Sequence, residues 1–153
     1  MAVDRKTFLL QAAAATTLSG RTAGAAQSPD LHGRFDDFCD LFYRRKRVRE
    51  AFEAHVAPDY IQHSSGMAQG REAAIQALEP MFGRANFSVT PTRTIWDGSL
   101  ATVILDVRVG EGVRAIVIDL YRYDHGRIVE HWDVKAEIEP DQREHYFDGL
   151  SVD

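Results

Sequence analysis

Apolar residues in the first half of the chain recur every three or four positions, which is the spacing of one face of an α-helix. The stripes predict helices over about residues 30–44, from Val48 to a stop at Pro58, and over residues 70–82. Between the last two helices, residues 59–63 are predicted to be a short extended segment. We therefore expect three helices in this region.

Beyond residue 86 apolar positions alternate with polar ones, which is the period of a β-strand with one buried face. Strands are predicted over residues 87–96, 100–109, 113–123 and 127–137, with glycine-containing turns between them. Helices followed by hairpin-linked strands predict an α+β domain, with three helices packed on one face of an antiparallel sheet. A sheet that curls around its helices encloses an apolar pocket.

The last predicted hairpin carries ionisable residues inside apolar runs. Asp119 lies within Ala-Ile-Val-Ile-Asp-Leu-Tyr, and His131 and Asp133 lie in the strand that follows. A carboxylate in so apolar a run either points to water or sits in a walled pocket. In a pocket the charged form is disfavoured, so the group holds its proton more tightly, which suits a general base.

The register of this hairpin decides which of these side chains meet. A three-residue loop over residues 124–126, with its glycine in the left-handed conformation, places Asp119 directly opposite His131. Tyr121 and Asp133 then share the same face, because side chains alternate along a strand.

A two-residue loop, His125-Gly126, is the alternative register. It places Asp119 opposite Trp132 and turns His131 to the other face. We favour the three-residue loop because it gathers a packed, partly exposed surface on the opposite face: Ile116, Ile118, Leu120, Ile128, Glu130 and Trp132.

Composition bounds the class of protein. A chain of 153 residues predicts one domain, and a net charge of −5 argues against a surface that binds nucleic acid. The single cysteine, Cys39, excludes an intrachain disulfide. Cys39 falls in an apolar helical stripe, where we expect it to be a small core residue.

Residues 1–27 are predicted to be a leader rather than part of the fold. Arg5 and Lys6 precede an apolar, alanine-rich run, and Ala23-Gly24-Ala25 supplies small residues for a cleavage site. The apolar run is too short to span a membrane. The stretch from Asp4 to Leu10 resembles a twin-arginine export signal, with Lys6 where the second arginine belongs. We expect a periplasmic or secreted protein; the alternative is a disordered alanine-rich tail.

Four stretches are familiar as a set: Tyr60-Ile61-Gln62-His63, Gly70-Arg71-Glu72-Ala73, Val117–Arg122 and Gly126–Val134. Together they resemble SnoaL-like proteins, which belong to the nuclear-transport-factor-2-like superfamily. The resemblance covers about residues 30–140, so we expect a SnoaL-like domain over residues 28–140. The tail over residues 141–153 is polar with a few apolar residues, and is a candidate to pack over an opening.

The resemblance implies a cone-shaped fold, in which a strongly curved antiparallel sheet wraps around helices and encloses a pocket. The superfamily includes polyketide cyclases that catalyse an intramolecular aldol condensation without a cofactor. In those cyclases an aspartate on a sheet strand acts as the base, and Asp119 matches that position. Many relatives on this fold are not enzymes, so the fold alone does not give the function.

An aldol cyclisation needs a base for a carbon acid and a donor for the enolate oxygen. Asp119 is the candidate base, and His131 is a candidate to donate to the oxyanion or to orient the carboxylate. His63 is a candidate second acid or donor from the helix side. The expected pocket residues are Tyr60, Phe82, Tyr121, Trp132 and Asp133.

Structural roles for the same residues are the alternative. Asp119 could pair with Arg71 or Arg122, and His131 and Asp133 could form a buried hydrogen-bonded pair that only stiffens the sheet. For His63, the corresponding structural role is that of a loop histidine that bonds to the backbone.

Two other kinds of site compete with the aldol site. His63, His131 and one of Asp119 or Asp133 could form a two-histidine, one-carboxylate metal site, but no short ligand spacing supports it. Asp119, Arg71 and Asp133 offer the residue types of an epoxide-hydrolase network without a recognisable motif. We therefore expect no metal and no cofactor.

The sequence thus predicts a cofactor-independent acid–base enzyme, of the aldol-condensation or cyclase type, that acts on a small apolar carbonyl compound. The competing class is a non-catalytic pocket protein that binds a small hydrophobic metabolite. We also expect a homodimer, because one face of the sheet would expose a large apolar patch to water. That patch comprises Ile116, Ile118, Leu120 and Trp132.

Overall fold

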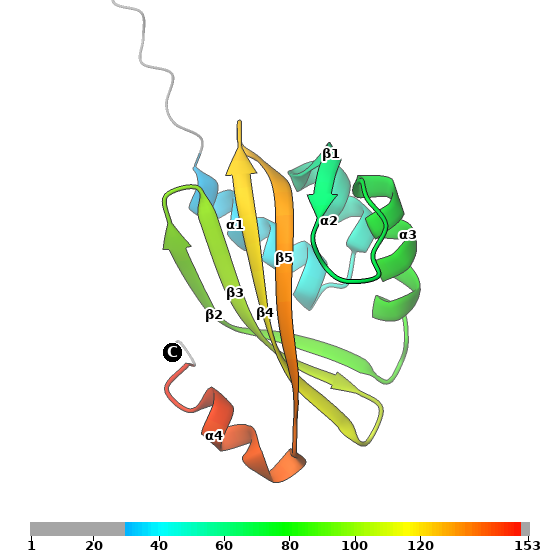
Figure 1. Ribbon diagram of the computed structural model, residues 1–153, viewed down its shortest axis with the longest axis vertical. Helices are drawn as coiled ribbons and strands as arrows, with labels where there is room; N and C mark the ends of the chain where they lie inside the picture. Colours follow the sequence, from blue (N-terminus) through cyan, green and yellow to red (C-terminus); the bar gives the residue numbers. More distant parts are fainter. Residues whose placement is uncertain (1–29, 151–153) are drawn as a thin grey trace, which may run out of the picture.

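The computed structural model describes residues 30–150, so the predicted leader over residues 1–27 lies outside the described part of the chain. Four α-helices occur within the described residues (Figure 1): α1 (Leu31–Cys39), α2 (Val48–His55), α3 (Arg71–Phe82) and α4 (Arg143–Phe147). A short 3₁₀-helix, η2 (Pro140–Gln142), leads into α4. No helix in residues 30–150 is long and apolar enough to cross a membrane.

The strands form one five-stranded sheet in the order β1-β5-β4-β3-β2. Their bounds are β1 (Val56–Gln62), β2 (Phe87–Asp97), β3 (Leu100–Val109), β4 (Val113–Asp124) and β5 (Arg127–Ile138). Helices α1, α2 and α3 lie together at one side of the sheet, whereas α4 lies apart from them (Figure 1). This architecture confirms the predicted α+β class, with a curved sheet packed on three N-terminal helices.

Strand β1 is longer than the short extended segment predicted from the sequence. It begins at Val56, directly after α2 ends at His55, and it runs through Pro58. Proline has no N–H to donate to a ladder, and it is tolerated here because β1 is an edge strand and Pro58 is exposed. Strand β1 runs parallel to β5, so the sheet is mixed rather than purely antiparallel as predicted.

An aromatic cluster joins the helices to the sheet. The ring of Phe38 in α1 lies with its centroid 5.3 to 6.2 Å from the centroids of Phe42, Tyr43, Phe52 and Tyr121. Cys39, the neighbour of Phe38, is also buried, as predicted for a core residue. Tyr121 belongs both to this cluster and to the cavity described below, so the cluster fixes one end of that cavity.

Residues Asp40–Arg44 form a π-helix, η1, which continues α1. Three consecutive side chains, Leu41, Phe42 and Tyr43, are buried in it. Successive side chains of a regular α-helix are about 100° apart, so three in a row do not share one buried face. The wider π-helical turn therefore directs Tyr43 into the core, in a type of distortion that often occurs at functional sites.

The loop between β4 and β5 has two residues, His125 and Gly126, because Asp124 pairs with Arg127. Both loop residues have positive φ, 47° for His125 and 75° for Gly126. These values belong to a type I′ turn. The predicted three-residue loop is wrong, because His125 also adopts the left-handed conformation that the prediction assigned to Gly126 alone.

A β-bulge then shifts the register of the same hairpin. Arg122 pairs with Glu130 while Tyr123 pairs with Ile128, which leaves Val129 as an extra residue on β5. A bulge bends its strand and increases the local twist, so it contributes to the curvature of the sheet.

The shifted register places Asp119 opposite Asp133 and Tyr121 opposite His131. The predicted direct pairing of Asp119 with His131 is therefore wrong, as is the alternative that pairs Asp119 with Trp132. Neither register included the bulge, which adds one residue to β5. The bulge also places four side chains on one face, as the three-residue loop had predicted: Asp119, Tyr121, His131 and Asp133.

The C-terminal helix α4 packs on the other face of the sheet. Asp106 of β3 lies between Leu105 and Val107, which line the concave cavity, so its side chain lies on the convex face. There Asp106 accepts hydrogen bonds from Arg114 Nε (3.0 Å) and from Arg143 Nε of α4 (3.3 Å). The described part of the tail therefore docks on the convex face and does not cover the cavity, contrary to the expectation from sequence.

Candidate functional site

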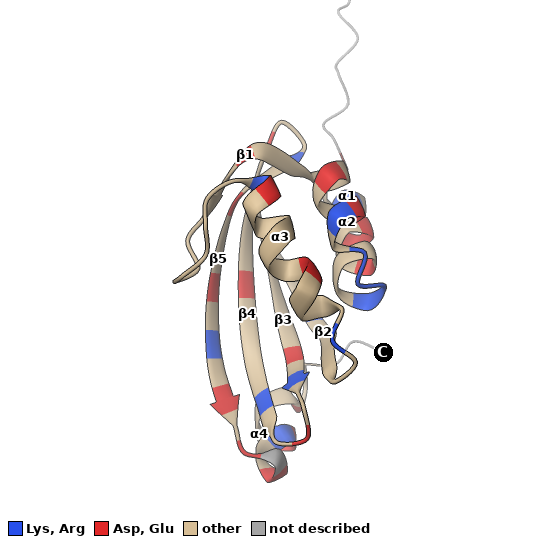
Figure 2. Cartoon of the chain, turned by 90° about the vertical axis from the view of Figure 1, so that its right-hand side faces the viewer, with Lys and Arg blue, Asp and Glu red and all other residues tan. Residues whose placement is uncertain are grey.

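A cavity of about 500 Å³ lies between the concave face of the sheet and the helical layer. This volume is within the range of small-molecule pockets. Most of the wall is apolar, with contributions from α3 and β3: Leu78, Met81, Phe82, Leu105, Val107 and Val109. Strands β3, β4 and β5 continue beyond the end of α3 (Figure 2), and the cavity-lining Lys135 and Glu137 are exposed there. The cavity is therefore open at this end.

Asp119 lies at the inner end of the cavity and is only 7% exposed. Tyr43 Oη donates a hydrogen bond of 2.6 Å to Asp119 Oδ2, and Tyr121 Oη lies 3.4 Å from the same oxygen. The two phenol oxygens are 2.5 Å apart. Burial is the main cause that raises the pKa of Tyr43 and Tyr121 well above the usual value, and the charge of Asp119 raises it further. Both phenols therefore remain protonated donors.

His131 is the second polar residue at this end, and it is also buried. Its Nε2 lies 3.3 Å from Asp119 Oδ1, while its Nδ1 lies 2.8 Å from Gln62 Oε1. Its ring stacks on Tyr121 with the centroids 4.7 Å apart. Asp119 and His131 are therefore in contact. They are not directly opposite each other, because the bulge shifts β5 relative to β4.

Gln62, on β1, connects the site to the edge of the sheet. Its Oε1 accepts a hydrogen bond from the backbone N–H of Ser64 (3.0 Å), and its Nε2 donates to Tyr60 Oη (3.1 Å). Gln62 is 5% exposed, so these contacts occur away from solvent. Together with Asp119 and His131 it forms a polar network whose members come from three strands.

His63 and Trp132 do not belong to this network. His63 follows the inward-facing Gln62, so the alternation of β1 turns it to the outer face, where its ring stacks on Trp132 with a centroid distance of 4.5 Å. His63 Nε2 is 3.8 Å from Glu130 Oε2. The predictions that His63 reaches the site and that Trp132 lines the pocket are therefore wrong.

The other predicted pocket residues, Tyr60, Phe82, Tyr121 and Asp133, all line the cavity. Asp133 begins a charged row along β5 that continues with Lys135 and Glu137 toward the open end. Figure 2 shows this acidic, basic and acidic succession on the strand. The cavity therefore has a charged row on β5 in addition to the polar network at its inner end, and most of the rest of its wall is apolar.

Neither alternative site assembles. The outward position of His63 separates it from His131, and no group of three or more His, Cys, Asp or Glu within residues 30–150 is arranged to hold a metal ion. Arg71 donates to the backbone oxygen of Val56, and Arg122 pairs with Glu130. Asp119 is therefore not paired with either arginine, and no Asp-Arg-Asp network forms.

The sequence reasoning missed Tyr43 and Gln62. Gln62 lies in the Tyr-Ile-Gln-His stretch, and strand alternation would have placed it inward with Tyr60, had a full strand been predicted there. Tyr43 follows a helical stripe in which its neighbour already faces the core. Tyr43 lies four residues after Cys39 but directly after Phe42, at the edge of the helical stripe, and the π-helix turns it inward.

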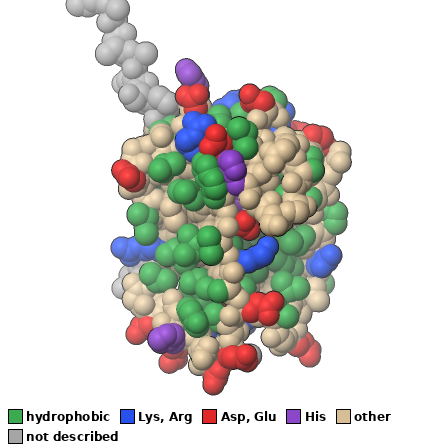
Figure 3. Space-filling view, in the orientation of Figure 1, with side chains coloured by type: hydrophobic (Ala, Val, Ile, Leu, Met, Phe, Trp, Pro, Cys, Tyr) green, Lys and Arg blue, Asp and Glu red, His purple; other side chains and the backbone are tan. Residues whose placement is uncertain are grey.

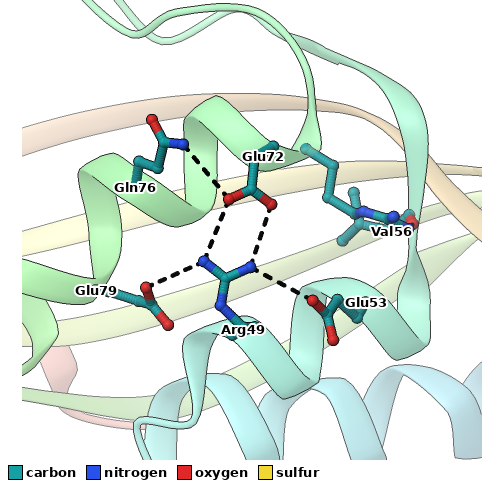
Figure 4. A network of polar contacts seen from close by, with 7 residues as sticks. Arg49, Glu53, Val56, Glu72, Gln76 and Glu79 are labelled. Carbon is teal, nitrogen blue, oxygen red and sulfur yellow. Dashed lines mark hydrogen bonds and ion pairs between the residues drawn. The ribbon is translucent and has the colours of Figure 1, made fainter.

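A surface ion-pair network holds together two helices that contribute to the cavity wall (Figure 4). Arg49 of α2 contacts Glu72 of α3 through two hydrogen bonds of 3.2 Å, and it also reaches Glu79 of α3 and Glu53 of its own helix. These side chains are exposed, so their individual contributions to stability are small. The geometry nonetheless links α2 to α3 across the outside of the cavity.

A sequence model of the SnoaL-like domain matches residues 35–131, which is more than half of the chain. The matched segment contains Tyr43, Gln62 and Asp119, and it ends at His131. No curated protein matches the chain in sequence.

Several solved structures have the same fold. TsrD from Streptomyces laurentii is 15% identical with a TM-score of 0.58, over 80% of this chain and 98% of TsrD. An NTF2-like protein of unknown function from Mesorhizobium loti is 20% identical with a TM-score of 0.61, over 69% of this chain and 90% of that protein. A candidate SnoaL-like polyketide cyclase from Jannaschia sp. CCS1 is 18% identical with a TM-score of 0.57, over 73% and 91% of the two chains. At these identities the similarity shows the fold alone.

Proposed function

Because the chain belongs to the SnoaL-like domain family, we propose that it catalyses cofactor-independent acid–base chemistry on a small apolar carbonyl compound. The reaction class is an aldol condensation or a related cyclisation. The observation that carries the proposal is the contact between Asp119 and His131 at the inner end of an apolar cavity, where Asp119 Oδ1 and His131 Nε2 are 3.3 Å apart.

The proposed chemistry follows from the different partners of the two carboxylate oxygens of Asp119. Tyr43 and Tyr121 hold one oxygen of Asp119, and the other oxygen contacts His131. Asp119 accepts the proton from the carbon next to a substrate carbonyl, and the resulting enolate is stabilised by a nearby hydrogen-bond donor. The enolate carbon then attacks a second carbonyl of the same molecule. A new carbon–carbon bond forms, and the alkoxide receives a proton from the Asp119–His131 pair.

The predominance of apolar side chains in the wall favours a second candidate function. A cavity lined mainly by side chains such as Phe82 and Leu105 also suits a protein that binds a hydrophobic metabolite without converting it. Both functions require ligand binding, and only the first requires turnover.

A screen of small aromatic and polyketide-like compounds that carry two carbonyl groups separates these functions. We expect at least one compound to be converted to a cyclic product, detected by chromatography with mass detection. His63→Gln is a matched control, because His63 lies on the outer face and its loss should leave the rate unchanged. Compounds that raise the melting temperature but are never converted would support the binding protein instead.

We also propose that the protein forms a homodimer through the convex face of the sheet. A row of aliphatic side chains crosses three strands there, because Ile104 pairs with Ile118 and Ile118 pairs with Val134. Ile118 is 39% exposed and Val134 is 70% exposed. Figure 3 shows hydrophobic side chains gathered over the strands. A nearly continuous apolar row on a sheet face can pack on its own copy about a two-fold axis.

Light scattering at micromolar concentration tests the dimer. We expect a mass of two chains for the protein and of one chain for Val134→Lys, since a buried unpaired charge opposes association. Glu137→Lys is the control, because Glu137 lines the cavity on the other face and should leave the dimer intact. A clean monomer for the unaltered protein would contradict this proposal.

A further inference from the structure

We propose that Gln62 is a positioning residue that fixes the tautomer of His131, so that Nδ1 carries the hydrogen and Nε2 is the atom that exchanges a proton with Asp119. Each hydrogen atom of this network is placed by a contact between heavy atoms. The catalytic consequence rests on the proposed function, whereas the tautomer itself does not.

The first step is the orientation of the Gln62 side-chain amide. The backbone N–H of Ser64 points at one atom of this amide from 3.0 Å. A backbone N–H can only donate, so the atom that faces it must be the amide oxygen. The amide nitrogen then faces Tyr60 Oη at 3.1 Å, which can accept. The orientation of Gln62 is thus fixed by groups other than His131.

The second step is the tautomer of His131. Its Nδ1 lies 2.8 Å from the same oxygen of Gln62. An amide oxygen has no hydrogen to give, so Nδ1 must be the donor and must carry the hydrogen. In the neutral imidazole, Nε2 then has a free lone pair.

The Nε2 lone pair of His131 faces Asp119. Nε2 of His131 is buried and has no hydrogen-bond partner of good geometry within residues 30–150. The nearest charged atom is Asp119 Oδ1, at 3.3 Å. A lone pair and a carboxylate oxygen repel each other unless one proton lies between them. The Asp119–His131 pair therefore has a defined place for one mobile proton, next to the cavity that both residues line.

Without Gln62, the position for a mobile proton between Asp119 and His131 is lost. His131 could then place its hydrogen on Nε2 and donate it to Asp119 in a static hydrogen bond. Asp119 would be occupied at both oxygens, by Tyr43 on one side and by His131 on the other. The carboxylate would then be a poorer acceptor for a substrate proton.

Nitrogen NMR of the full chain tests the tautomer directly. Spectra of His131, titrated between about pH 5 and 8, should show a protonated Nδ1 and an unprotonated Nε2 at the alkaline end. Gln62→Met should shift His131 toward the form that is protonated at Nε2. Gln62→Glu keeps an oxygen acceptor at this position and should retain the original tautomer.

Gln69→Met is the matched control for these variants. Gln69 bonds to the backbone of Gln62 at 3.0 and 2.7 Å, and the contacts of His131 do not include it. Its loss therefore perturbs the same loop without changing the acceptor, and the tautomer should be that of the unaltered protein. At the alkaline end of the titration, a hydrogen on Nε2 and none on Nδ1 in the unaltered protein would overturn the inference, as would an unchanged tautomer in a folded Gln62→Met variant. The spectrum of the unaltered protein decides the point even if that variant does not fold.

Kinetics with a converted compound supply the second readout. Gln62→Met should lower kcat by about 10–100-fold, by analogy with the range found for groups that orient a metal-binding histidine through its second nitrogen. KM should change little, and Gln62→Glu should restore part of the rate. If no compound is converted, the proposed function fails while the tautomer is still decided by NMR. A folded Gln62→Met variant with the altered tautomer and an unchanged kcat would refute the positioning role alone.

Discussion

Asp119→Asn should abolish turnover while the protein remains folded and still binds its ligand. The amide is nearly isosteric with the carboxylate, and its oxygen can still accept the hydrogen bond from Tyr43. It cannot accept a proton from a carbon acid, so the interaction that is lost belongs to the transition state. General acid–base catalysis contributes roughly 10²–10⁴-fold to a rate, and a loss of kcat of that size is the expected result.

Asp133→Asn is the control for this variant, because Asp133 is the cross-strand neighbour of Asp119 and lines the same cavity. It should leave kcat largely unchanged. Thermal melting and calorimetric ligand binding complete the test. If Asp119 has only a structural role, Asp119→Asn should lower both the melting temperature and the ligand affinity, because its partners are left mismatched. Full turnover in a folded Asp119→Asn variant would remove Asp119 from the mechanism.

Asp106→Ala should lower the free energy of unfolding by about 3–5 kcal/mol, the usual effect of removing one partner of a buried ion pair. The side chains of Asp106 and Arg114 are 7% and 11% exposed, and they share two hydrogen bonds on the convex face. Removal of the carboxylate leaves the Arg114 guanidinium buried without a counter-charge. It also frees α4, because Arg143 contacts the same carboxylate.

Urea unfolding of the two variants Asp106→Ala and Arg143→Ala separates these contributions. Arg143 is 48% exposed, so its loss should cost no more than about 1 kcal/mol. A large loss for Arg143→Ala with a small loss for Asp106→Ala would mean that the docking of α4, rather than the buried charge of Arg114, dominates the stability of this region.

The elements with the most regular alternation of apolar and polar residues were predicted most accurately. The predicted strands over residues 100–109 and 113–123 match β3 and β4 to within one residue, because their alternation is regular. The register of β4 and β5 was wrong because it depends on two local features. The left-handed conformation of the non-glycine residue His125 and the bulge at Val129 leave no mark in the alternation of apolar and polar residues from which the strands were predicted.

The candidate site shows the same division. Asp119 and His131 were predicted on one face, and they lie on one face because the two register errors of one residue each add to a shift of two residues, which leaves the face unchanged. Tyr43 was missed because its orientation depends on the π-helix, and Gln62 was missed because β1 was predicted too short. His63 was wrongly included because inward positions on a strand recur every second residue, and His63 lies one position beyond the inward-facing Gln62.

Because Cys39 is buried, its reaction with a thiol-reactive dye reports local opening of the fold. Burial raises the pKa of its thiol far above the usual range, so the folded protein offers a thiol-reactive dye almost no thiolate. Cys39 ends α1 beside Phe38, in the packing between that helix and the sheet. Dye incorporation must therefore wait until this packing opens. With one sulfhydryl in the sequence, the rate of dye incorporation reports the opening of this packing alone.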